Sequence, residues 1–108
     1  MRRSYTAVLE RGEPLAGEWV TEPYEAGWAT EALFFVRLLE GPATARITAR
    51  VQLSPDGMRW IDEGTALPEL RDGLAFARVR EFGNWLRLAG TVSGADEVRA
   101  LIYLTLKE

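Results

Sequence analysis

The stretch RITARVQLSPDGMRWID, residues 46–62, predicts two strands joined by a tight turn. Polar and apolar residues alternate strictly from Arg46 to Leu53, and alternate side chains of a strand point to opposite faces. One face of this strand is therefore expected to be buried and the other solvated. Ser54-Pro55-Asp56-Gly57 has the composition of a turn, and Met58–Asp62 is expected to return as the second strand of a hairpin.

The same period of two recurs along the chain. It predicts strands at 75–82, 85–92 and 98–107, and shorter edge strands at 5–9 and 19–21. Residues 32–39 are almost continuously apolar, which favours a central strand covered on both faces. Seven to eight short strands separated by turns, without a long helix, indicate an antiparallel β-sandwich of the jelly-roll type. We expect one domain, residues 1–108.

The composition excludes several classes of function. The chain contains no cysteine and no histidine, which removes thiol nucleophiles, disulfides and imidazole bases. Its 13 basic and 16 acidic residues give a net charge of −3, so nucleic-acid binding through bulk charge is disfavoured. No apolar run is long enough to cross a membrane or to form a signal peptide, and we expect a cytoplasmic protein.

Lys107 is the single lysine beside 12 arginines. This bias is reported in thermostable proteins and is also produced by a GC-rich genome.

The sequence carries no enzyme signature. It has no phosphate-binding glycine loop or dinucleotide fingerprint, and its serines have no histidine to act as a base. Asp62-Glu63 and Asp96-Glu97 are paired carboxylates, but neighbours on a strand face opposite ways, and solvated turn charges are the simpler interpretation. We therefore predict no catalytic residues, no cofactor and no metal ligands, and expect a protein that is not an enzyme.

Two strands are apolar on both faces. Leu33 and Phe35 lie opposite the core-facing Phe34, and Leu101 and Tyr103 lie opposite Ile102. A sheet with two apolar faces needs a cover for the second one. The loop 23–28 could supply it, or another subunit could. We take Leu33, Phe35, Leu101 and Tyr103 as a candidate interface of a homo-oligomer or of a larger protein assembly.

The four tryptophans offer a second candidate site. Flat indole faces can stack on sugars, which makes a carbohydrate-binding module the alternative function. Trp60 follows the hairpin turn and is interpreted as structural. Trp85 falls on the face opposite Leu86, beside Arg87, and is expected to be exposed. Trp28, Trp85 and Arg87 are the candidate ligand contacts.

Residues 30–108 resemble two groups of β-sandwich proteins. The strand 45–53 with Ser54-Pro55-Asp56-Gly57 and Trp60 is similar to the S-x-D-G-x-x-W hairpin of discoidin-type domains and of small sandwich proteins encoded among phage structural genes. Residues 82–88, FGNWLRL, resemble the later strand that both groups carry. Gly90-Thr91-Val92-Ser93-Gly94 and the closing hydrophobic strand are closer to the phage-type set.

The phage-type resemblance implies a non-enzymatic component of a virion or particle, such as a decorating or tail-associated subunit. The discoidin-type resemblance implies binding of sugars or lipid head groups. We expect the first function, self-assembly or decoration of a larger protein surface.

Overall fold

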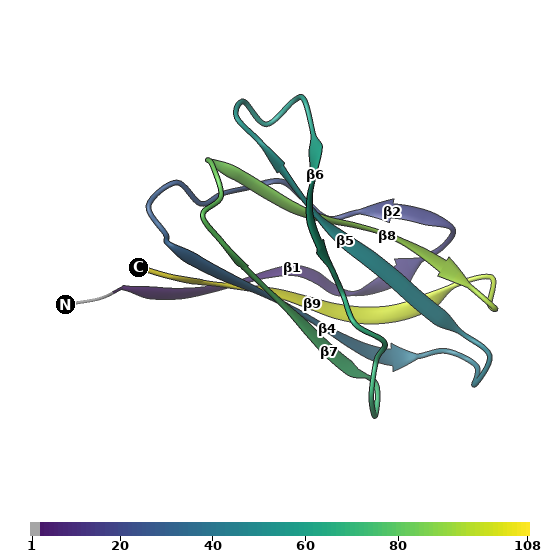
Figure 1. Cartoon of the computed structure of the whole chain (residues 1–108). Helices are drawn as coiled ribbons and strands as arrows, with labels where there is room; N and C mark the ends of the chain where they lie inside the picture. The colour runs from purple at the N-terminus through teal and green to yellow at the C-terminus, as the bar shows by residue number, and fades with distance from the viewer. Residues whose placement is uncertain (1–2) are drawn as a thin grey trace.

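A computed structural model describes residues 3–108 as an all-β protein of two antiparallel sheets packed face to face (Figure 1). Met1 and Arg2, part of the segment considered for a signal peptide, lie outside the described residues. The strands of sheet A, in spatial order, are β1 (Ser4–Leu15), β9 (Val98–Lys107), β4 (Glu31–Glu40) and β7 (Leu74–Arg80). Those of sheet B are β2 (Glu18–Val20), β8 (Trp85–Ser93), β5 (Arg46–Ser54) and β6 (Ile61–Ala66). A short β3 (Tyr24–Glu25) also pairs with β8.

The strand order is that of a jelly roll, which confirms the predicted fold class. Strands β1 and β9 come from opposite ends of the chain and pair along their length, so Ser4 and Lys107 lie side by side at one end of the sandwich (Figure 1). Arg3 and Glu108 close this end through an ion pair of 3.0 Å. The structure has nine strands where seven to eight were predicted, because part of the expected loop at 23–28 forms β3.

The core lies between the two sheets and is built from one face of every long strand. Fully buried side chains from sheet A include Phe34, Ile102 and Leu104, and those from sheet B include Leu86 and Leu88. The predicted central position of 32–39 is confirmed, since β4 lies between β9 and β7, but its outer face is not covered by residues 3–108. Sheet A also turns several small side chains inward: Ala32, Ala75, Ala77 and Ala100.

The hairpin turn is held by two side chains. The Ser54 hydroxyl accepts the amide N–H of Gly57 at 2.9 Å and donates to the Asp56 carboxylate at 2.9 Å. The same carboxylate oxygen accepts the amide N–H groups of Met58 at 2.9 Å and Arg59 at 3.0 Å. Because Asp56 holds those two amides, they are not free to join a ladder. This explains why β6 begins at Ile61, three residues later than predicted.

Strand β1 is longer than the predicted 5–9 because it bends instead of ending. Its register against β9 shifts between Val8 and Glu10 and again between Arg11 and Pro14, which marks two bulges. Gly12 lies in the second bulge with a φ of 95°, a backbone conformation that glycine adopts without a steric penalty. The bulges let β1 follow the curved edge of sheet A as far as Leu15.

Gly90 is required by a close contact in the core. The buried Trp19 of β2 lies against its backbone, and a Cβ at residue 90 would collide with the indole and with the carbonyl oxygen of Thr48. Neither the β5 backbone nor the buried Trp19 can easily shift to relieve this collision. The Trp19 Nε1 hydrogen has no hydrogen-bond partner in residues 3–108.

Gly90→Ala is therefore expected to lower the free energy of unfolding by about 1–3 kcal/mol, the usual range for overpacking a core. Urea denaturation of both proteins measures the difference. Gly83→Ala is the matched control, because a Cβ there meets nothing within 4 Å. A Gly90→Ala protein as stable as the Gly83→Ala protein would contradict this description of the core.

The turn also predicts a pH dependence of stability. Hydrogen bonds from the amides of Arg59 and Met58, and from the Ser54 hydroxyl, lower the pKa of Asp56 from its ordinary value. A carboxyl whose pKa is lower in the folded state stabilises the fold above its unfolded pKa of about 4, and that contribution is lost as the pH falls through the folded pKa.

Asp56→Ala should accordingly reduce the free energy of unfolding at pH 7 and flatten its decline below about pH 4. Chemical denaturation at a series of pH values makes the comparison. Asp96→Ala, at an exposed position in another turn, serves as the control. Parallel pH profiles for wild type and Asp56→Ala would show that the turn does not stabilise the fold through this carboxylate.

Candidate functional site on the outer faces of the sheets

The outer face of sheet A carries a band of large apolar side chains. Period-two alternation turns Phe34, Val36 and Ile102 into the core, so their strand neighbours point outward. Phe35 of β4 stands in register between Tyr103 of β9 and Phe76 of β7. We call the following residues the sheet-A patch: Leu33, Phe35, Leu74, Phe76, Leu101 and Tyr103.

The patch is a contiguous surface. The rings of Phe35 and Phe76 lie 6.0 Å apart, tilted by 33°, and the Arg78 guanidinium lies 5.9 Å from the centre of the Phe76 ring. Phe76 is 48% exposed and Leu74 51%, although a side chain of either type is usually buried. Apolar residues that are both large and adjacent in this way mark an interaction surface more often than isolated ones do.

All four residues of the candidate interface lie on this face. Phe35, Leu101 and Tyr103 are half-buried, whereas Leu33 is only 7% exposed and can offer little contact area. The structure adds Leu74 and Phe76, which sequence reasoning missed. Their signal was present, because Phe76 shares its strand face with Arg78 and Arg80 while the small Ala75 and Ala77 take the other.

The loop 23–28 does not cover the sheet-A patch. Tyr24 and Glu25 pair with Leu86 and Trp85 at the edge of sheet B, and Ala26 is fully buried in the core. Tyr24 stacks on Tyr5 with ring centres 6.3 Å apart. This loop therefore closes one end of the sandwich, and nothing else in residues 3–108 lies over the patch.

The rim of the patch is basic although the chain is acidic overall. Six cationic side chains stand on the outer face of sheet A: Arg11, Arg37, Arg78, Arg80, Arg99 and Lys107. Two carboxylates form ion pairs with them. Glu31 pairs with Arg78 at 3.1 Å and with Arg80 at 3.7 Å, and Glu40 pairs with Arg99 at 3.7 Å. The face thus carries an excess of positive charge.

The tryptophans do not form a shared platform. Trp19 is buried in the core. The Arg3 guanidinium lies 4.4 Å from the centre of the Trp28 ring. The hairpin turn packs against Trp85, and a Cβ at Gly57 would lie 3.3 Å from its indole. Each of the proposed ligand contacts Trp28 and Trp85 therefore has intramolecular contacts over its indole.

Arg87 is paired differently from the prediction. The sequence suggested an Arg87–Trp85 pair with Trp60 in a structural role, but the Arg87 guanidinium lies over Trp60, 4.3 Å from the ring centre. Arg87 and Trp85 share the outer face of β8 two residues apart. Trp60 was missed as its partner because the partner depends on where the hairpin brings residue 60 back, which the turn geometry decides.

Residues 3–108 contain no group of three acidic side chains placed to hold a metal ion, and no helix that could span a membrane. The arrangement presents two surfaces instead. Sheet A offers an apolar face with a basic rim, and sheet B offers a polar face centred on Arg87.

Comparison with known proteins finds similar folds among solved structures and no match in sequence. No protein-family model and no curated protein sequence matches the chain. Among solved structures, the chain is similar to the SPBc2 prophage-derived protein YomS, with a TM-score of 0.66 and 10% identity over 100% of this chain and 96% of that one.

Two further structures share the fold. The PBSX exported protein XepA matches with a TM-score of 0.62 and 12% identity, over 98% of this chain but 36% of that chain. The Yersinia pseudotuberculosis-derived mitogen YPM matches with a TM-score of 0.50 and 12% identity, over 99% of this chain and 84% of that chain. At these identities the likeness shows the jelly-roll fold.

Proposed function

We propose that this protein is a non-enzymatic structural protein that assembles through the outer face of sheet A. The observation that carries the proposal is the half-exposed pair Leu74 and Phe76, which continues the apolar row of Phe35 and Tyr103. Removing a large apolar side chain from water stabilises a complex by about 1.5–3 kcal/mol when its burial is complete. Several such residues on one face are sufficient to drive association.

The proposed partner is a second copy of this chain. Its own carboxylates supply the complementary charge, since most of the 16 acidic residues lie outside sheet A. Three exposed glutamates, Glu18, Glu22 and Glu25, follow the opposite side of the molecule along β2 and β3. Two patches placed face to face would set basic rim against basic rim. A head-to-tail contact between the patch and an acidic surface avoids this repulsion.

A phage-associated role is part of the proposal. Two of the similar structures are described as a prophage-derived protein and a PBSX exported protein, which supports a phage association. A particle subunit needs a rigid fold and an interaction face and needs no catalytic groups. The absence of histidine and cysteine is consistent with that requirement.

Light scattering coupled to size-exclusion chromatography tests the proposal. The wild-type chain is expected to elute as a discrete oligomer at micromolar concentration. Phe35→Ser combined with Phe76→Ser should shift it to the monomer mass, because the variant loses both aromatic contacts. Met58→Ser is the control, since Met58 is 78% exposed on the hairpin turn, away from the patch. A wild-type chain that is strictly monomeric would overturn the proposal.

The charge argument makes a separate prediction. Arg37→Glu places a carboxylate at the rim of the patch and should weaken association at low salt. Raising the salt concentration should weaken wild-type association too, because rim charges in solvent are screened within about 10 Å at 0.1 M salt. Association that Arg37→Glu and salt both leave unchanged would show that rim charge does not select the partner.

A further inference from the structure

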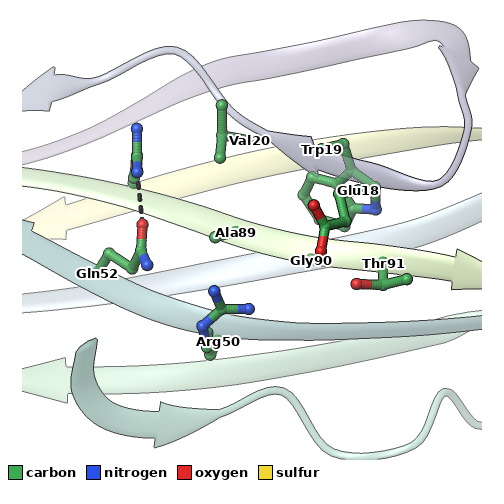
Figure 2. Close-up of a pocket in the computed structure, with 9 residues that line it drawn as sticks. Glu18, Trp19, Val20, Arg50, Gln52, Ala89, Gly90 and Thr91 are labelled. Atoms are coloured by element: carbon green, nitrogen blue, oxygen red, sulfur yellow. Dashed lines mark hydrogen bonds between the residues drawn. The ribbon is translucent and has the colours of Figure 1, made fainter. Parts of the chain in front are cut away.

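A hollow of about 240 Å³ lies on the outer face of sheet B, far from the sheet-A patch. Figure 2 shows Ala89 and Gly90 of β8 in its middle, with Val20 of β2 on one side and Arg50 and Gln52 of β5 on the other. Glu18 and Thr91 lie toward one end of the hollow (Figure 2). Its floor is low because Ala89 carries a small side chain and Gly90 contributes only backbone, since its side-chain position faces Trp19 in the core.

A chain of hydrogen bonds fixes the polar side of the hollow. The Asp62 carboxylate accepts from Arg50 Nε at 3.0 Å and from Gln52 Nε2 at 2.9 Å. The Gln52 carbonyl oxygen accepts from Arg87 Nε at 2.7 Å. A carboxylate can only accept and a guanidinium can only donate, so Gln52 is held in one orientation between them. Gln52 is 8% exposed, which makes this a built site rather than a set of mobile surface groups.

This network leaves unused donors at the hollow. Arg50 and Arg87 each donate their Nε hydrogen within the network, to Asp62 and Gln52 respectively. Their terminal nitrogens remain to bind a ligand. Arg87 is held further by Trp60 and forms no ion pair with a carboxylate of residues 3–108. Desolvation, and then the nearby Arg50, lower the pKa of Arg87, which nevertheless stays protonated at neutral pH. An anion bound here would offset both effects.

The geometry points to a binding site for an acidic sugar, with its carboxylate on the terminal nitrogens of Arg50 and Arg87 and its hydroxyl groups toward Glu18 and Thr91. Guanidinium groups bind carboxylates in a planar, bidentate manner. Glu18 at the other end accepts hydrogen bonds from hydroxyls and repels a second negative charge, which selects a singly charged ligand. Val20 is 55% exposed and offers an apolar surface to the sugar ring.

The size of the hollow limits the ligand. Pockets for drug-sized molecules measure about 300–1,000 Å³, and this one is smaller, so it suits one sugar ring. The site uses Arg87 and not the faces of Trp28 and Trp85, which other groups cover. Its residues belong to sheet B, and Glu18 is shared with the acidic surface proposed to contact the sheet-A patch of a second copy.

Amide NMR shifts during titration with glucuronate test this inference on the whole chain. Selective shifts are expected in β2 and in Arg87–Thr91, with a dissociation constant on the order of 1 mM for so small a ligand. Glucose is the neutral control and should produce no shifts at the same concentrations. Equal binding of glucose would overturn the role of the carboxylate, and equal binding of acetate would show an anion site without sugar recognition. No shifts with glucuronate would overturn the whole inference.

Variants separate recognition from folding. Arg87→Lys keeps a positive charge but lacks the fork that reaches both Gln52 and a carboxylate, and should weaken glucuronate binding about tenfold. Arg87→Ala should abolish binding. Arg71→Ala, an exposed arginine in the segment before β7, is the matched control and should bind as wild type does. Unchanged binding by Arg87→Lys and Arg87→Ala, with wild-type thermal melts, would contradict the assignment.

Discussion

The spacing between the two sheets governs the rest of this structure. Packed sheets share one layer of side chains about 10 Å thick, and only one face of each strand contributes to that layer. In β7 the small Ala75 and Ala77 face inward and Phe76 faces outward. Strands β4 and β9 carry large side chains on both faces, such as Phe35 opposite Phe34. Because only one face of each strand enters the inner layer, the outward side chains form an apolar surface that nothing else in residues 3–108 covers.

The two outer faces differ in chemistry. Sheet A is apolar with a basic rim, while sheet B carries a hydrogen-bonded polar network in which each member limits the orientation of the next. A surface of the first kind gains free energy when water is excluded over a large area, which suits a protein partner. A surface of the second kind holds a few donors in fixed positions, which suits a small ligand. A jelly roll can present both because its two outer faces are separate surfaces.

Much of the fold follows from the sequence. Alternation in β5, β8 and β9 predicts their bounds within a residue or so, because a buried face enforces register. The bounds of β1 and β6 were missed, since bulges and the Asp56 turn act through backbone hydrogen bonds that leave no periodic signal. The two-faced strands located Phe35, Leu101 and Tyr103 of the sheet-A patch from the sequence, although Leu74 and Phe76 were missed. The Arg87–Trp60 contact and the hollow were not, because both depend on how β2, β5 and β8 come together across the sheet.

Hydrogen exchange measured at several protein concentrations tests the central claim, that the outer face of sheet A contacts another copy. Strand β7 is an edge strand that pairs only with β4, and β6 is the matching edge strand of sheet B. If the sheet-A patch is the contact, amides in Leu74–Arg80 should exchange more slowly as concentration rises, while those in Ile61–Ala66 should not change. Exchange in β7 that is independent of concentration in an associated sample would contradict the account.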